Sequence, residues 1–214
     1  MKQNRNNWRV WINKLYTCID LDKLDEAIQA SLQLIEFKSK KNSSEEIPEI
    51  EEKCVRAIIG KSVHNRLKAS ESNDKVALDS AKRTLNRCEE LLNKLSTASE
   101  SKTWIWEVRA DFDEMTGRSV NVLDHLMKEY RSIQAISNWE TNHENAKKMC
   151  NLVLKISDIL KAEGSRPNLI KSKLLLKGII NKLKRAYFNK ADIPEEITQL
   201  ESYQNEIETI IKKS

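Results

Sequence analysis

Apolar residues recur every three or four positions along most of this chain, a spacing that places them on one face of an α-helix. The clearest case is a single stripe made by Leu78, Ala81, Leu85, Cys88, Leu92 and Leu95. Polar clusters, glycine and proline interrupt the pattern and mark where one helix ends and the next begins. We therefore expect a chain of amphipathic helices.

The interruptions divide the sequence into nine expected helices. The first, Trp8 to Ile19, is followed by the polar turn DLDK and by a second helix, Leu24 to Phe37, so these two should form an antiparallel hairpin. Residues 39–48 should form a polar loop that places Pro48 in the first turn of a third helix, Glu49 to Lys68. The fourth helix carries the stripe from Leu78 to Leu95, and the others are expected at 104–115, 119–136, 144–161, 168–188 and 194–212.

The scarcity of turn residues argues against a β-sandwich or a β-barrel. The 214 residues include only four Gly and three Pro, whereas those folds need turn signals about every 8–12 positions. Charged residues make up 32% of the chain and hydrophobic residues 39%, a balance that suits helices with one buried face. We predict an all-α fold.

Amphipathic helices joined by short turns either close into a bundle or stack as a row of hairpins, and an internal repeat favours the stack. The segment WINKLYTCIDLDKLDEAI, residues 11–28, places Trp11 sixteen residues before Ala27. A side chain as small as that of Ala27 allows two helices to cross closely, and the Trp11 indole would fill the wedge between them. The alternative is an ordinary bundle with tryptophans in its core.

This spacing resembles the tetratricopeptide repeat, a helical hairpin of about 34 residues with an early aromatic residue and a conserved alanine. Trp11 at position four puts Ala27 at position twenty. Residues 106–130 resemble a second copy, with Trp106 at position four, Ala110 at position eight and Gly117 at the turn. Both copies depart from the pattern, at Leu15 and Ser31 in the first and at Val122 in the second.

The order of segments resembles the C-terminal part of the tetratricopeptide repeat protein 27 family. The likeness covers most of residues 8–212 and is strongest at 8–35 and 104–130. Beside the first hairpin it rests on CVRAII (54–59), WIWEVRADF (104–112) and NWE (138–140). Members of that family are larger and their repeats continue upstream, so the resemblance implies a C-terminal fragment or a shortened relative. It also implies a cytoplasmic α-helical scaffold without catalysis.

We therefore expect antiparallel hairpins stacked as a tetratricopeptide-like α-solenoid with a C-terminal helical cap. Residues 1–137 should form the degenerate hairpin region, and residues 138–214 the cap of long amphipathic helices.

No constellation of catalytic residues is visible in the sequence. His64, His125 and His143 are isolated, and the four glycines cannot form a nucleotide-binding loop. The cysteines lie on expected apolar stripes, where a thiol acts as a small hydrophobe, with a disulfide or metal site as the alternative: Cys18, Cys54, Cys88 and Cys150. We expect no enzyme activity, no cofactor and no metal.

The tetratricopeptide resemblance implies a groove lined by the first helix of each hairpin. The residues at groove positions are Arg9, Ile12, Tyr16, Trp104, Glu107 and Asp111. Ile12 and Tyr16 stand where carboxylate-binding members carry Lys and Asn, and Glu107 and Asp111 would repel a carboxylate. The groove therefore suits a helix or a basic segment of a protein partner, unless neighbouring helices of the same chain fill it.

The segment 166–190 carries eight basic residues and no Asp or Glu. RNA contact through Lys182, Lys184 and Arg185 is therefore an alternative function, and contact with an anionic membrane is another. The final helix offers a third explanation, because its glutamates would neutralise this segment if the two helices paired antiparallel: Glu195, Glu196, Glu201, Glu206 and Glu208.

The N-terminal sequence MKQNRNNW has no apolar signal region, and no apolar run approaches the roughly 18 residues needed to span a bilayer. The net charge of +5 is mild for 214 residues. We expect a cytoplasmic, non-catalytic adaptor that binds an unidentified protein in the assembly of cytoplasmic complexes.

Overall fold

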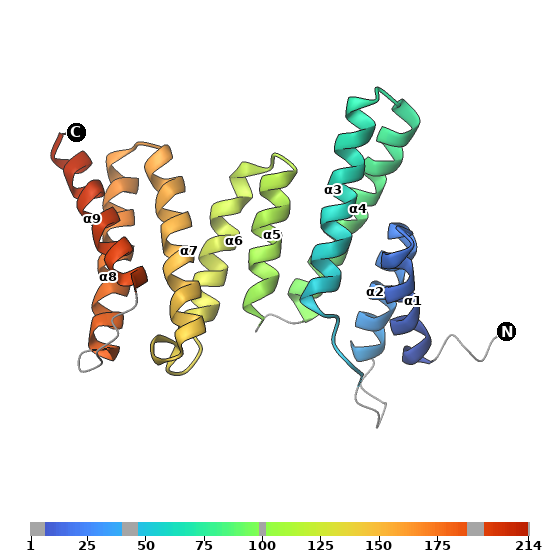
Figure 1. The fold of residues 1–214 in the computed structure, drawn as a ribbon, viewed down its shortest axis with the longest axis horizontal. Coiled ribbons are helices and arrows are strands. Elements are labelled where there is room, and N and C mark those ends of the chain that lie inside the picture. The colour runs from blue at the N-terminus through green and yellow to red at the C-terminus, as the bar shows by residue number, and fades with distance from the viewer. Residues whose placement is uncertain (1–6, 40–46, 99–101, 188–194, 214) are drawn as a thin grey trace. The chain divides into compact units, whose positions relative to one another are not determined.

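The computed structural model describes residues 7–39, 47–98, 102–187 and 195–213, and all regular structure in these ranges is helical. Figure 1 shows α1 (Trp8–Asp20), α2 (Leu24–Ser39), α3 (Glu52–Glu71), α4 (Lys75–Ala98), α5 (Thr103–Met115), α6 (Ser119–Gln134), α7 (His143–Ala162), α8 (Arg166–Ala186) and α9 (Glu195–Lys213). A short 3-10 helix (Trp139–Thr141) lies between α6 and α7 in the chain. The expected all-α fold class is confirmed.

The third helix departs most from its expected bounds. It begins at Glu52 and ends at Glu71, three residues later than expected at both ends. The expectation that Pro48 lies in its first turn was wrong, because residues 47–51 are not helical. Ile50 in this stretch is buried, and Glu51 is extended at φ −73° and ψ 142°. Burial of Ile50 against the core thus favours an extended approach to the helix. Phe188 and Pro194, expected at helix ends, lie outside the described residues.

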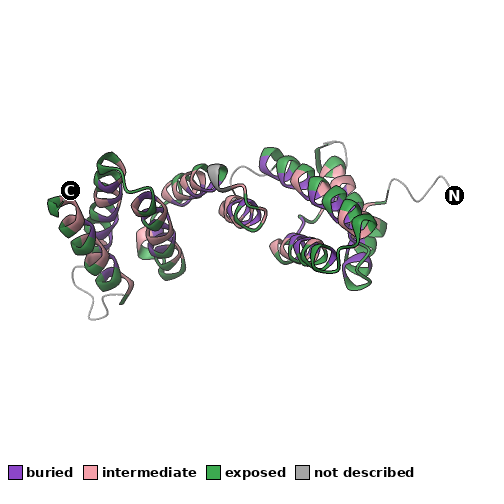
Figure 2. Ribbon diagram, turned by 90° about the horizontal axis from the view of Figure 1, so that it is seen from above, coloured by how far each residue is buried: buried purple, intermediate pink, exposed green. Residues whose placement is uncertain are grey.

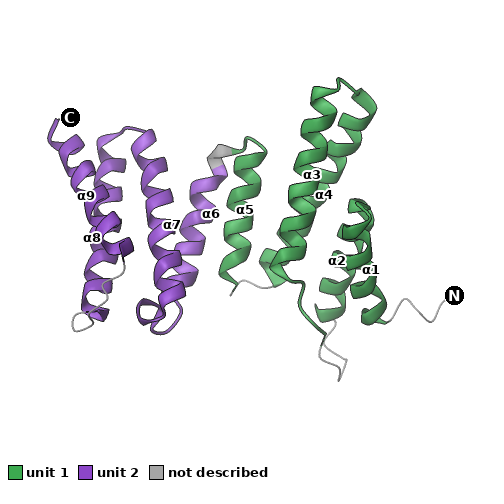
Figure 3. Ribbon diagram, viewed as in Figure 1, with its two compact units in different colours: residues 1–118 green, residues 119–214 purple. Residues whose placement is uncertain are grey.

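The chain forms two compact units, Met1–Arg118 and Ser119–Ser214 (Figure 3). The first contains α1 to α5 and the second contains α6 to α9. The expected boundary between a hairpin region and a cap at residues 137 and 138 stays a prediction, since contacts define these units and a repeat pattern defines that boundary.

Stacked hairpins build the first unit. Helix α1 packs on α2, and α3 packs on α4. The two hairpins are joined because α2 contacts α4 and α3 contacts α1, while α5 contacts both α3 and α4. The buried faces of these helices turn toward one another (Figure 2). Each helix contributes large buried side chains to one core, among them Leu15, Ile28, Ile58, Leu91 and Phe112.

In the second unit, α7 contacts α6, α8 and α9, and α8 packs on α9. Lys173 pairs with Glu208 at 3.2 Å, and Lys184 pairs with Glu201. Since the partners run in opposite order along the two helices, α8 and α9 are antiparallel. The expected pairing of the basic helix with the acidic final helix is therefore confirmed.

Helices α1, α3, α5 and α7 end in similar turns. In each case a linker of three residues separates the helix from the next one. The middle residue of each linker has a positive φ: Asp22 (54°), Asn73 (57°), Gly117 (77°) and Gly164 (68°). At the first three turns, the N–H of this residue donates to the carbonyl three residues back. The following N–H donates to the carbonyl five residues back, and these bonds span 2.7–3.3 Å. This pattern closes a helix where Gly, Asn or Asp tolerates the left-handed conformation. The backbone therefore repeats this hydrogen-bonded turn three times, and the fourth turn shares its linker length and its positive φ.

The residues predicted to mark the repeats occupy packed positions. Ala27 and Ala110 are fully buried, and Trp11 and Trp106 are half-buried. Trp11 packs against the core of the first unit. These positions are compatible with close helix packing, but the role of the four residues and of Gly117 as repeat markers stays a prediction.

Replacing Asn73 by glycine should stabilise the protein by about 0.5 kcal/mol, because glycine adopts a positive φ without strain. The matched change Asn65→Gly, inside α3, should instead cost about 0.3–0.5 kcal/mol. Chemical denaturation measures both. Effects of the same sign at the two positions would contradict the turn assignment.

Candidate partner-binding surface

Helix α3 lies between α1 and α5 in the first unit, in contact with both. The six predicted groove residues lie on α1 and α5, so α3 separates the two groups. We use the name α1–α3–α5 face for the surface made by Arg9, Ile12, Tyr16, Glu51, Glu52, Lys53, Arg56, Trp104, Glu107 and Asp111.

Arg56 joins α3 to α5 on this face. Its Nη2 lies 3.1 Å from Glu107 Oε1, and its Nη1 lies 3.0 Å from Asp111 Oδ2. Its Nε lies 2.7 Å from Glu52 Oε1, one turn earlier on α3. Burial by itself lowers the pKa of Arg56, but hydrogen bonds to Glu52 and Asp111 and the charge of Glu107 raise it overall. Three carboxylates therefore surround one guanidinium, which leaves a negative excess among these four groups.

Tyr16 joins α1 to the segment that precedes α3. Its hydroxyl donates to Glu51 Oε1 at 2.8 Å, and Lys53 Nζ lies 2.6 Å from Glu51 Oε2. The hydrogen bond to this carboxylate, with a further contribution from burial, raises the pKa of Tyr16 to about 12. Hydrogen bonds from Lys53 and then from Tyr16 lower the pKa of Glu51. Tyr16, Glu51 and Lys53 thus form a chain of polar contacts at the edge of the face.

The other predicted groove residues lie in different surroundings. Arg9 is exposed, with its guanidinium 5.2 Å from the centroid of the Trp8 ring. Ile12 and Trp104 pack against the core, and Trp104 also lines a cavity of about 270 Å³. The structure therefore brings Glu107 and Asp111 together around Arg56, whereas Ile12 and Trp104 support the fold. The partner-binding role of the six residues stays a prediction.

Sequence reasoning missed Glu51, Glu52 and Arg56. A signal existed for one contact, because Glu52 and Arg56 are four residues apart and therefore neighbours on a helix. The contact of Arg56 with Asp111, 55 residues away in sequence, leaves no such trace.

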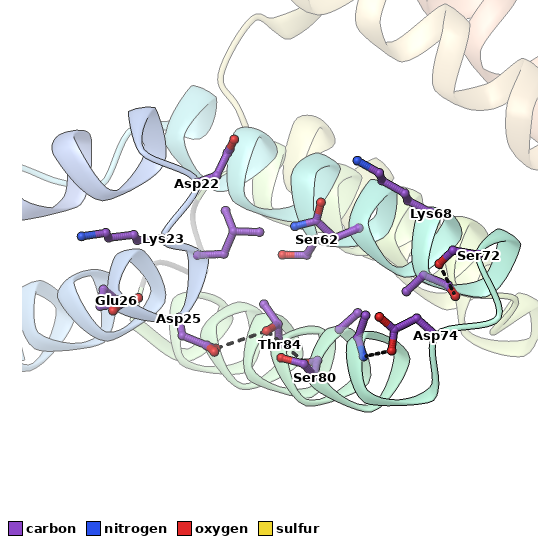
Figure 4. Close-up of a pocket in the computed structure, with 15 residues that line it drawn as sticks. Asp22, Lys23, Asp25, Glu26, Ser62, Lys68, Ser72, Asp74, Ser80 and Thr84 are labelled. Carbon is purple, nitrogen blue, oxygen red and sulfur yellow. Dashed lines mark hydrogen bonds between the residues drawn. The ribbon is translucent and has the colours of Figure 1, made fainter.

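A cavity of about 530 Å³ lies between the α1–α2 turn and the α3–α4 hairpin (Figure 4). It forms where the longer second hairpin extends past the shorter first one. Its polar groups serve the fold: Thr84 donates to Asp25 at 3.3 Å, and Asp25 pairs with Arg87 at 2.9 Å. Asp74 accepts the N–H groups of Val76 and Ala77 at the start of α4. The lining residues include no His or Cys, so they provide no nucleophile–base pair of that kind.

The three basic residues predicted as an RNA contact lie on α8. Lys184 pairs with Glu201 on α9, and Lys182 Nζ lies 5.9 Å from the centroid of the Trp139 ring. Arg185 is exposed. Neutralisation of part of the helix by α9 favours the intramolecular explanation over an RNA site.

All four cysteines are buried and free, which confirms their predicted role as small core residues. Burial raises the pKa of Cys88 to about 11 and that of Cys150 to about 12, so both thiols stay protonated at neutral pH.

Within the described ranges, no group of three His, Cys, Asp or Glu residues is placed to hold a metal ion. Within those ranges too, every helix is too short or too polar to cross a membrane.

The hairpins and their equivalent turns define an all-α protein of the helical-repeat class. No family model matches the sequence. The chain is 20% identical over 187 residues to the tetratricopeptide repeat protein 27 homolog of Dictyostelium discoideum. That match covers 87% of this chain and 20% of the relative, so the chain spans about a fifth of the relative's length. The crystal structure of the de novo designed helical repeat protein DHR64 is 15% identical, with a TM-score of 0.29 over 96% of this chain and 95% of that chain. The sequence likeness supports a tetratricopeptide-like relationship.

Tyr16 should ionise near pH 12 and not near its ordinary value of 10.0. Because folding raises the pKa of Tyr16, the protonated phenol contributes to the free energy of unfolding in full below pH 10, and this contribution is lost as the pH rises through 12. The difference in ultraviolet absorbance between wild type and Tyr16→Phe, followed during alkaline titration, isolates this phenol. Glu51→Gln should move the transition back toward pH 10, and a transition already near pH 10 in the wild type would refute the hydrogen bond.

Proposed function

We propose that this chain is a non-catalytic, tetratricopeptide-like scaffold whose α1–α3–α5 face binds a basic segment of a protein partner. The observation that carries the proposal is the cluster of Glu52, Glu107 and Asp111 around Arg56. Arg56 holds these carboxylates in position before a partner arrives, so less side-chain freedom is lost on binding. Their negative excess attracts lysine or arginine and repels a terminal carboxylate.

Tyr16 and Glu51, on the same face, also suit a basic side chain of a partner. Tyr16 is partly exposed and presents an aromatic ring next to the Glu51 carboxylate. An aromatic ring beside carboxylates can accommodate both the aliphatic stem and the charged head of a long basic side chain. A basic helix or extended segment therefore fits this face better than an acidic tail does.

The same proposal covers the family, the location and the cellular role of the protein. Likeness to the tetratricopeptide repeat protein 27 homolog supports membership of that family. A cytoplasmic location and a role in assembling protein complexes are what the resemblance to the family implies, and they are part of the proposal.

The double variant Glu107→Lys with Asp111→Lys should reduce recovery of a stoichiometric protein partner at least about tenfold. Reversal of two charges places cations where the partner's basic side chains must bind. Affinity capture from cytosol, quantified by mass spectrometry, measures the loss. Asp79→Lys with Glu90→Lys is the matched control, since it makes the same charge change at exposed positions on α4.

Thermal unfolding of both variants should be recorded, because the reversed charges also lie beside Arg56. The milder pair Glu107→Gln with Asp111→Asn tests the same contacts with less repulsion. Undiminished capture by folded variants of both kinds would remove this face from the binding site.

A further inference from the structure

Helix α8 carries a straight exposed stripe on its outer side. The positions follow one another at intervals of four, four, three, four and four residues, which keeps them on one side of a helix. They are Arg166, Ile170, Leu174, Lys177, Asn181 and Arg185, and all are exposed. Ile170 is 43% exposed and Leu174 is 63% exposed.

The two exposed aliphatic residues are separate from the core of the second unit. The buried face of α8 is made by other residues, namely Leu169, Ser172, Leu176, Ile179, Ile180 and Leu183. Ile170 and Leu174 therefore form a second apolar group, one helical turn apart, between Arg166 and Lys177.

Acidic residues of α9 pair with lysines beside the stripe. Glu208 lies 3.2 Å from Lys173, and Glu201 pairs with Lys184. Helix α8 itself contains no Asp or Glu from Arg166 to Ala186. The stripe thus combines three cations, two aliphatic side chains and one amide, without any carboxylate of its own.

We propose that the outer stripe of α8 binds the surface of an anionic lipid membrane. Arginine and lysine attract anionic headgroups, while aliphatic side chains between them insert at the boundary between headgroups and acyl chains. The stripe is about 28 Å long at the rise of an α-helix, so its three cations can contact several headgroups at once. Adsorption of this kind leaves the helix lying in the plane of the membrane surface.

The same features distinguish a membrane from a nucleic acid. Single-stranded nucleic acid is usually held by aromatic side chains on which bases stack, and the stripe carries none. Phosphate contacts would use the three cations but would gain nothing from Ile170 and Leu174. The lipid surface uses both parts of the stripe. This inference concerns the second unit and does not depend on the partner surface of the first.

Co-sedimentation of the 214-residue protein with vesicles tests the electrostatic part. Binding to phosphatidylcholine vesicles that contain phosphatidylserine should be at least about tenfold stronger than binding to pure phosphatidylcholine. Each basic residue near an anionic surface strengthens binding roughly fivefold. The triple variant Arg166→Glu, Lys177→Glu, Arg185→Glu should therefore bind at least about 100-fold more weakly, because the new carboxylates also repel the surface.

A triple variant in the first unit, Lys82→Glu, Arg83→Glu, Lys94→Glu, is the matched control, because it makes the same change in net charge at exposed positions. It should keep most of the binding. Circular dichroism verifies folding, and the neutral set Arg166→Gln, Lys177→Gln, Arg185→Gln replaces the reversal variant if that variant unfolds. Equal binding to both kinds of vesicle, or equal losses in the stripe and control variants, would overturn the proposal.

The pair Ile170→Asn with Leu174→Asn tests the aliphatic part without changing charge. It should weaken vesicle binding about tenfold, because two aliphatic side chains no longer insert. A single-stranded RNA oligonucleotide serves as the competing probe. RNA binding that is lost in the stripe triple variant, together with vesicle binding that is unchanged in the asparagine pair, would assign the stripe to nucleic acid and refute the lipid site.

Discussion

Close packing of α2 is the constraint on which the first unit depends. This helix contacts α1, α3 and α4, and three of its small residues, Ala27, Ala30 and Ser31, are fully buried. The Ser31 hydroxyl donates to the Ala27 carbonyl at 3.0 Å, which satisfies the one polar side chain in this group. Larger side chains here would push the neighbouring helices apart, because a protein core is already close-packed. The placement of α1 beside α3 therefore rests on small residues in the helix behind them.

Polar contacts then connect α3 to α1 and to α5. Lys61 on α3 donates to the Ile19 carbonyl at 2.7 Å, near the end of α1, and also pairs with Asp22 at 2.5 Å in the adjoining turn. Arg56 on α3 connects this helix to α5 through its ion pairs with Glu107 and Asp111. The charged groups of the α1–α3–α5 face thus contribute to the fold and also form the surface proposed for a partner. That double role explains why a local negative excess is tolerated: the carboxylates are held by a cation that bridges two helices.

The sequence predicted the helices well, because the period of apolar residues is a local property that tertiary contacts seldom override in long segments. It failed at Pro48, where burial of the neighbouring Ile50 favours an extended approach to α3. The sequence placed turns at DLDK and at Gly117, but it did not show that these turns share one geometry. Asp22 and Asn73 adopt the same conformation, but Asp and Asn are common in many kinds of loop and do not identify it by themselves.

The candidate site was less predictable than the fold. Glu107 and Asp111 were identified from their positions in a repeat pattern, whereas their contact with Arg56 depends on how two helices meet. A carboxylate that awaits a ligand and one that already pairs with a neighbouring helix look the same in sequence. Charge did predict the pairing of α8 with α9, since a basic helix followed by an acidic one has few other ways to neutralise itself. The exposed pair Ile170 and Leu174 could not be separated by sequence from the buried apolar residues around them.

The free energy of unfolding of Ala27→Leu tests most directly whether the α1–α3–α5 face rests on the packing of α2. The added methylenes have no space at a fully buried position, so denaturant unfolding should show a loss of about 1–3 kcal/mol. Gln29→Leu adds an apolar side chain at an exposed position of the same helix and should change stability by no more than about 0.5 kcal/mol. If Ala27→Leu were as stable as the wild type, the close packing of α2 would not be the constraint that positions this surface.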